Sequence, residues 1–154
     1  MKNKWIIEII SAALVLLLVY AASGKFMDYP LFVAQLLTHP YLKPFAGFLA
    51  WSVPAVELLI SVLVIIPRTR LAGLYSAAAL LFTFTVYLVL MLLTDKNLPC
   101  SCSGIISSLS WGEHIVFNIL FIILAIIGTW LYRKRNFIRG MSKKHSLSRL
   151  FDVC

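Results

Sequence analysis

The stretch Leu71–Leu93, which reads LAGLYSAAALLFTFTVYLVLMLL, contains no charged residue. An α-helix needs roughly 20 mostly apolar residues to cross a bilayer, and this stretch provides them. Three further runs are similar, with at most one charged residue each: 5–22 with Glu8, 45–66 with Glu57, and 115–131. Hydrophobic residues make up 61% of the chain, which leaves little sequence for a water-soluble domain. The sequence therefore predicts an all-α membrane protein, a bundle of four transmembrane helices.

The segments between these runs complete the predicted fold. Residues 23–44 are too apolar for a plain loop; Asp28 followed by Pro30 is typical of a helix start, and Pro40 would end the helix. We therefore expect a short helix at the outer membrane surface between the first two spans. The chain divides into a four-helix transmembrane domain, 1–132, and a basic cytoplasmic tail, 133–154.

The basic residues are distributed unevenly along the chain. Eleven of the fourteen Lys and Arg residues fall in the N-terminus, in the 67–70 turn and in the tail. By the positive-inside rule, both termini are expected in the cytoplasm of a bacterial cell, with the chain in the inner membrane and the connection before the fourth span in the periplasm. Basic charge directly behind a membrane span suits anionic lipid. We therefore expect the lipid bilayer, and not nucleic acid, as a partner.

Two cysteines one residue apart lie in the sequence Pro99-Cys100-Ser101-Cys102-Ser103-Gly104. In an oxidising compartment such a pair forms a disulfide and can exchange it with a partner, so a redox pair is the favoured interpretation. A structural disulfide is an alternative, although so short a ring restricts little of the chain. A metal site is a weaker alternative, because His114 is the only nearby additional ligand. We expect no metal site.

Three more polar residues are candidates for function. His114, close in sequence to the cysteines, could act as a base toward a thiol, or it could be an interfacial residue at a helix start. Glu57 lies near the middle of the second span, where an ionised carboxylate is costly. It is either a proton relay or polar anchor for a cofactor, or a hydrogen-bonded residue that pins two helices together. Lys25 is expected to extend to the outer interface, and Glu8 to be solvated near the cytoplasmic surface.

Three motifs follow one another along the chain: Ser23-Gly24-Lys25-Phe26, Pro54-Ala55-Val56-Glu57 and Pro99–Gly104. With these motifs the chain resembles the DoxX-like superfamily, and within it the methylamine-utilisation MauE branch of small four-helix membrane proteins. The resemblance covers about Val15 to Ile127. It implies that Cys100 and Cys102 are the redox pair, and it marks Lys25 and Glu57 as family-pattern positions. The family pattern commonly has Gly between the cysteines and an aromatic residue before the final Gly; this chain has Ser at both places.

Two functions are consistent with these features. The resemblance implies an inner-membrane thiol–disulfide redox protein that exchanges electrons with a thioredoxin-like protein of the periplasm, with a link to methylamine metabolism. If a quinone is the other redox partner, it should dock between helices near the outer leaflet, but the sequence itself identifies no cofactor. The alternative is a non-enzymatic membrane subunit that scaffolds or stabilises a larger envelope complex, with Cys100 and Cys102 as a structural disulfide.

Overall fold

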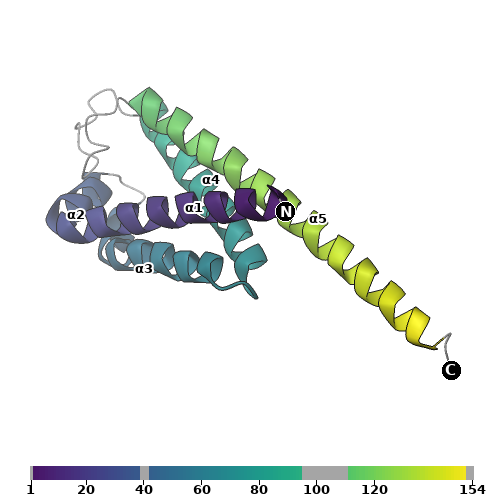
Figure 1. Cartoon of the computed structure of the whole chain (residues 1–154). Coiled ribbons are helices and arrows are strands. Elements are labelled where there is room, and N and C mark those ends of the chain that lie inside the picture. Colours follow the sequence, from purple (N-terminus) through teal and green to yellow (C-terminus); the bar gives the residue numbers. More distant parts are fainter. Residues whose placement is uncertain (1, 39–41, 95–110, 152–154) are drawn as a thin grey trace.

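The computed structural model describes residues 2–38, 42–94 and 111–151, and all regular structure within these ranges is helical. The elements are α1 (Lys2–Met27), α2 (Tyr29–Thr38), the short 3₁₀ helix η1 (Lys43–Phe45), α3 (Ala46–Ile65), α4 (Arg70–Thr94) and α5 (Trp111–Phe151) (Figure 1). Helices α1, α3, α4 and α5 are each long and apolar enough to cross a membrane. The predicted fold class is confirmed, and α2 is the short helix predicted between the first two spans. Its position at the membrane surface stays a prediction.

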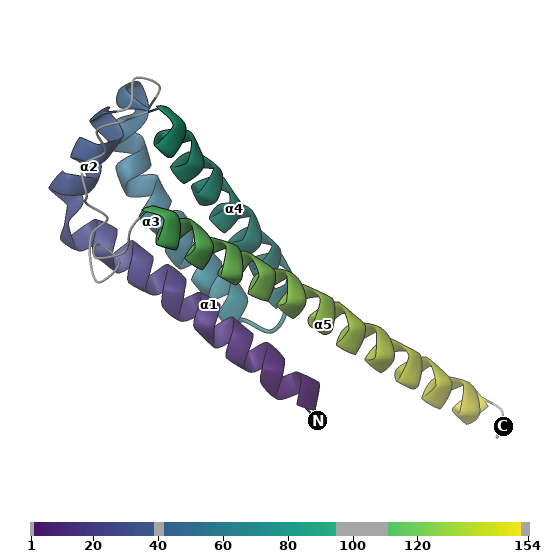
Figure 2. The same cartoon turned by 90° about the horizontal axis from the view of Figure 1, so that it is seen from above.

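The long helices pack as two pairs, α1 with α3 and α4 with α5. The two pairs cross, and they diverge from one another toward the end at which α2 lies (Figure 1). Helix α2 packs on α3 and lies beside the first half of that helix (Figure 2). The end of the molecule that holds α2 also holds the last turn of α1, the end of α4 and the start of α5.

Buried apolar residues join the helices along their length. One cluster links α1, α4 and α5 through residues that include Ile7, Leu14 and Leu74, and a second links α1, α3 and α4 through Leu18 and Val64. A third cluster lies between α2 and α3. Many large apolar side chains point outward instead, among them Leu16, Leu59, Phe82 and Ile126. Helices that are apolar on all sides are typical of a protein whose surroundings are lipid.

Polar contacts fix the turn between α3 and α4. The Arg70 Nη1 atom lies 2.8 Å from Glu8 Oε1, and its Nε donates to the carbonyl oxygen of Val64 at 3.1 Å. The Tyr132 hydroxyl donates to the carbonyl oxygen of Pro67 at 2.6 Å. Glu8 was expected to be solvated; its side chain is 43% exposed, and it is nevertheless paired across the bundle. The turn is therefore held by α1 on one side and by α5 on the other.

Helix α5 continues without a break past the predicted end of the membrane domain at residue 132. It projects beyond the other helices as a single rod (Figures 1 and 2). The predicted tail thus begins inside a helix and shares its axis with the fourth membrane span.

Gly73 allows α4 to approach α3 closely beside the turn. A Cβ atom at this position would lie 2.6 Å from the Val64 backbone nitrogen and 2.8 Å from the Leu63 carbonyl carbon. Both are backbone atoms, so the two helices would have to move apart. Gly47, in the first turn of α3, has no atom within 4 Å of an added Cβ.

We expect Gly73→Ala to lower the free energy of unfolding by about 1–3 kcal/mol, because the added methyl group overpacks the helix contact. Gly47→Ala is the matched control, and it should leave stability unchanged or raise it by up to about 1 kcal/mol through helix propensity. Denaturation of the purified protein in detergent micelles measures both. Equal stability of the two variants would contradict the close approach of α3 and α4.

Candidate functional site

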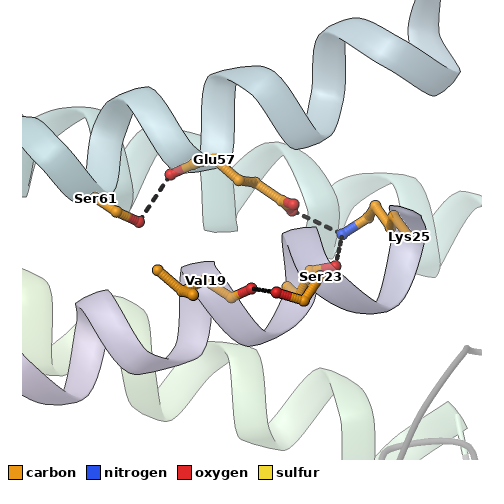
Figure 3. Close-up of polar contacts among 6 residues, drawn as sticks. Val19, Ser23, Lys25, Glu57 and Ser61 are labelled. Carbon is orange, nitrogen blue, oxygen red and sulfur yellow. Dashed lines mark hydrogen bonds and ion pairs between the residues drawn. The ribbon is translucent and has the colours of Figure 1, made fainter. Parts of the chain in front are cut away.

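Lys25, in the last turn of α1, and Glu57, in the middle of α3, form an ion pair (Figure 3). Lys25 Nζ lies 2.7 Å from Glu57 Oε1, and only 1% of the Glu57 side chain is exposed. The positive charge offsets much of the cost of holding a carboxylate away from water. The contact joins two helices through residues 32 positions apart in sequence. It also shows Glu57 in one of the two roles predicted for it, as a bonded residue that pins helices together.

The surroundings of Lys25 direct its side chain inward. Its Nζ lies 3.4 Å from the carbonyl oxygen of Ala21, one turn back on α1. It also lies 5.2 Å from the ring centre of Phe84 on α4 and 5.9 Å from that of Phe32 on α2. Contacts at these distances attract a cation to the face of an aromatic ring. The expectation that Lys25 extends to the outer interface is therefore wrong, because a carboxylate and two rings hold its ammonium group inside the bundle.

The backbone around Glu57 suits a buried polar residue. Ser61 Oγ donates to the carbonyl oxygen of Glu57 at 2.9 Å (Figure 3). Pro54, three residues before Glu57, is buried inside α3. A proline within a helix removes the hydrogen bond that its N–H would make to the preceding turn. Side-chain hydroxyls and prolines of this kind are tolerated in membrane helices because neighbouring groups bond the freed backbone atoms.

A cavity of about 160 Å³ lies beside the ion pair. Both Lys25 and Glu57 line it, together with residues from α1, α2, α4 and α5. Its aromatic walls include Phe32, Phe84 and Phe117. The cavity thus lies among all five α-helices, toward the end where the two helix pairs diverge.

Polar groups from α5 and α2 complete the cavity lining. His114 and Asn118 are one turn apart on α5, and Gln35 comes from α2. Asn118 is buried and His114 is partly buried. The structure therefore brings three of the residues selected from the sequence, Lys25, Glu57 and His114, to one cavity. Gln35 was not selected, because a single Gln in a short apolar helix gives no sequence signal of its own.

One oxygen atom of the Glu57 carboxylate has no hydrogen-bond donor among the described residues. Oε1 receives the Lys25 ammonium, whereas Oε2 is buried and accepts no hydrogen bond from any residue that the structure describes. Buried polar atoms are nearly always bonded, so such an atom on a residue that lines a cavity is a candidate ligand contact.

Cys100 and Cys102 lie outside the described residues. The connection that carries them joins the end of α4, at Thr94, to the start of α5, at Trp111. Among the residues that the structure does describe, no group of three or more His, Cys, Asp or Glu side chains could hold a metal ion.

Comparison with known families gives one match. Residues 3–131 match the family model described as methylamine utilisation protein MauE. The match extends over the four helices long enough to cross a membrane, and it leaves out most of the part of α5 that projects beyond the bundle. Comparisons with curated proteins and with solved structures give no match.

The ion pair can be tested by a double-mutant cycle. We expect Lys25→Met to lower the free energy of unfolding by about 3–5 kcal/mol, because it leaves the Glu57 carboxylate buried without a partner. Glu57→Gln should cost less, since the partly exposed Lys25 can extend toward water. The double variant should be far more stable than the sum of the single losses predicts, because no charge then remains buried.

The control is the pair of Glu8 and Arg70, whose carboxylate is 43% exposed, and the same cycle with Glu8→Gln and Arg70→Met should give a smaller coupling. Denaturation in detergent micelles measures both cycles. Additive losses for Lys25 and Glu57 would show that the two residues do not interact.

Proposed function

This chain belongs to the MauE family of methylamine utilisation proteins, and we propose that it is a thiol–disulfide redox protein of the bacterial inner membrane. Its four long apolar helices make it a multi-pass membrane protein. In the proposal, Cys100 and Cys102 exchange electrons with a thioredoxin-like protein outside the cytoplasm. The wider DoxX-like relationship remains a prediction from the motifs.

One observation carries the proposal. The connection that holds Cys100 and Cys102 is attached to α4 and α5 at the end of the bundle where the cavity lies. His114, in the first turn of α5, lines that cavity together with Lys25 and Glu57. The helix ends to which this connection is attached thus lie beside a site with an imidazole, an ammonium and a carboxylate. A purely structural disulfide has no need of such a site beside it.

The proposed reaction is an exchange through a mixed disulfide. A thiolate of one partner attacks the disulfide of the other, so that one S–S bond forms as another breaks. The second thiolate of the attacking pair then displaces the partner and closes its own disulfide. In total, two electrons and two protons pass from the dithiol to the disulfide. His114 is placed on the helix that follows the cysteines, and as a neutral imidazole it can accept a thiol proton.

The proposed orientation places both termini in the cytoplasm and the connection between α4 and α5 in the periplasm. Its support is the distribution of basic residues, since the turn between α3 and α4 and the extension of α5 carry Arg and Lys. In this orientation the cysteines lie in the compartment where disulfides persist.

The alternative function, a scaffolding subunit of a larger envelope complex, is favoured by the form of α5. The helix continues to Phe151 and projects past the other helices, which leaves its basic end available to another protein. In this alternative Cys100 and Cys102 form a structural disulfide. The two experiments below separate the two functions.

The proposed orientation predicts which thiols can be reached from outside. A membrane-impermeant maleimide, applied to reduced intact cells, should label the Cys154→Ala variant at Cys100 or Cys102. The Cys100→Ala/Cys102→Ala variant, whose single remaining thiol is Cys154, should be labelled only after the membrane is permeabilised. Labelling of Cys154 in intact cells would reverse the orientation.

The proposed exchange predicts a covalent intermediate. Removing the resolving cysteine leaves the partner attached, so either Cys100→Ala or Cys102→Ala should accumulate a mixed disulfide with a thioredoxin-like protein of the periplasm. The adduct should disappear on reduction and be absent from the double variant, while Cys154→Ala should behave as wild type. If neither single variant traps a partner and the double variant keeps full function in cells, the cysteines are structural and the scaffolding alternative holds.

A further inference from the structure

The cavity beside Lys25 and Glu57 has the hydrogen-bonding groups of a site for an oxygen-bearing ligand. Glu57 Oε2 is buried without a donor among the described residues, and a buried acceptor that is left unbonded is destabilising. The Lys25 ammonium carries three N–H groups, of which two are directed to Glu57 Oε1 and to the Ala21 carbonyl. The pair therefore offers one acceptor and one further donor at the same place in the cavity.

The charge balance of the site favours a neutral ligand. Lys25 and Glu57 neutralise one another, and most of the other residues that line the cavity are apolar or aromatic. An anion would compete with Glu57 for the ammonium, and a cation would compete with Lys25 for the carboxylate, so either would leave a buried charge unpaired. A plain acyl chain would use neither the donor nor the acceptor. The ligand that fits is uncharged and carries an oxygen atom.

The walls and the volume favour a flat ring. Phe32, Phe84 and Phe117 line the cavity from three different helices. Its volume of about 160 Å³ is close to that of a cavity of roughly 150 Å³ that, in an engineered lysozyme, holds one benzene ring. Aromatic rings pack well against one another in offset or edge-to-face geometry.

We propose that this cavity binds the head group of a membrane-soluble quinone, with one ring oxygen at Lys25 and Glu57. In the quinone the oxygen is a carbonyl, which accepts a hydrogen bond from Lys25 Nζ. In the quinol it is a hydroxyl, which donates to Glu57 Oε2. The pair thus provides a partner for each redox form without any change in its own charge.

The inference rests on the proposed function for its source of electrons. The dithiol of Cys100 and Cys102 loses two electrons and two protons as its S–S bond forms. The quinone gains both electrons and both protons, one proton on each ring oxygen, and becomes the quinol. The quinone would in this way re-form the Cys100–Cys102 disulfide after that disulfide has accepted two electrons and two protons from the thiols of the partner, whose own disulfide forms in the exchange.

The test is photolabelling of the full-length protein in phospholipid nanodiscs with an azido-benzoquinone that carries a decyl tail. Cross-linked peptides identified by mass spectrometry should come from the cavity-lining parts of α1, α4 and α5. Decyl-ubiquinone should compete for labelling, whereas decylbenzene, which has the same tail and no ring oxygen, should not.

Two variants and one control locate the site. Phe84→Trp narrows the cavity and should reduce specific labelling by about tenfold or more. Leu88→Trp, at a buried position of the lining, should do the same, and it replaces the first variant if that one does not fold. Phe82→Trp is the matched control, since Phe82 lies on the same helix and is 62% exposed, and it should label as wild type.

The outcomes separate this inference from the proposed function. Labelling that decylbenzene blocks equally well, or that persists in folded Phe84→Trp and Leu88→Trp, would overturn the quinone site. The Cys100→Ala/Cys102→Ala variant should label normally, because binding does not need the thiols. Partner trapping without specific quinone labelling would reject this inference alone, and specific labelling without partner trapping would support the site while rejecting the thiol exchange.

Discussion

The ion pair between Lys25 and Glu57 determines how the other helices are arranged. A carboxylate in the middle of a membrane helix needs a partner, and Lys25 reaches it because the last turn of α1 lies beside the middle of α3. This stagger leaves the first half of α3 without α1 beside it. Helix α2 covers that part, with Leu36 packed against Ala46 and Ala50. The short helix therefore covers the part of α3 that α1 does not reach.

The same stagger accounts for the cavity. Where α1 ends, α4 and α5 diverge from α1 and α3. The cavity lies in the space between them, and side chains from all five α-helices line it. Besides the charged pair, Gln35, His114 and the buried Asn118 bring polar groups to a site whose other lining residues are mostly apolar or aromatic. We propose that this site, next to the attachment points of the cysteine-bearing connection, joins exchange with a soluble thiol protein to exchange with a carrier dissolved in lipid.

The helices could be predicted from the sequence, but the pairing of their charges could not. The four spans follow from uninterrupted apolar runs, and α2 follows from Asp28 and Pro30 at its start. Lys25 was placed at the interface because it follows the first apolar run, and a long basic side chain in that position can extend to the membrane surface. Its inward direction depends on the stagger of α1 against α3, which residues far apart in sequence decide together. The pairing of Glu8 with Arg70 was not predicted for the same reason, because the two residues are 62 positions apart in sequence. One signal was present: a chain with six acidic residues has few partners for a cation, so a Glu inside a span and a Lys beside another could have been paired.

The most direct test of this account is a distance between the two side chains in a lipid bilayer. Solid-state NMR of the reconstituted protein, labelled with ¹⁵N at lysine Nζ and with ¹³C at the glutamate carboxyl carbon, measures their dipolar coupling. We expect a strong coupling that matches the 2.7 Å contact between Lys25 Nζ and Glu57 Oε1. This coupling should disappear in Lys25→Met, whereas the signals of the other lysines and glutamates should be kept. A wild-type spectrum that shows no such coupling would contradict the ion pair. The position of α1 against α3 and the pair of charged groups in the cavity lining both depend on that contact.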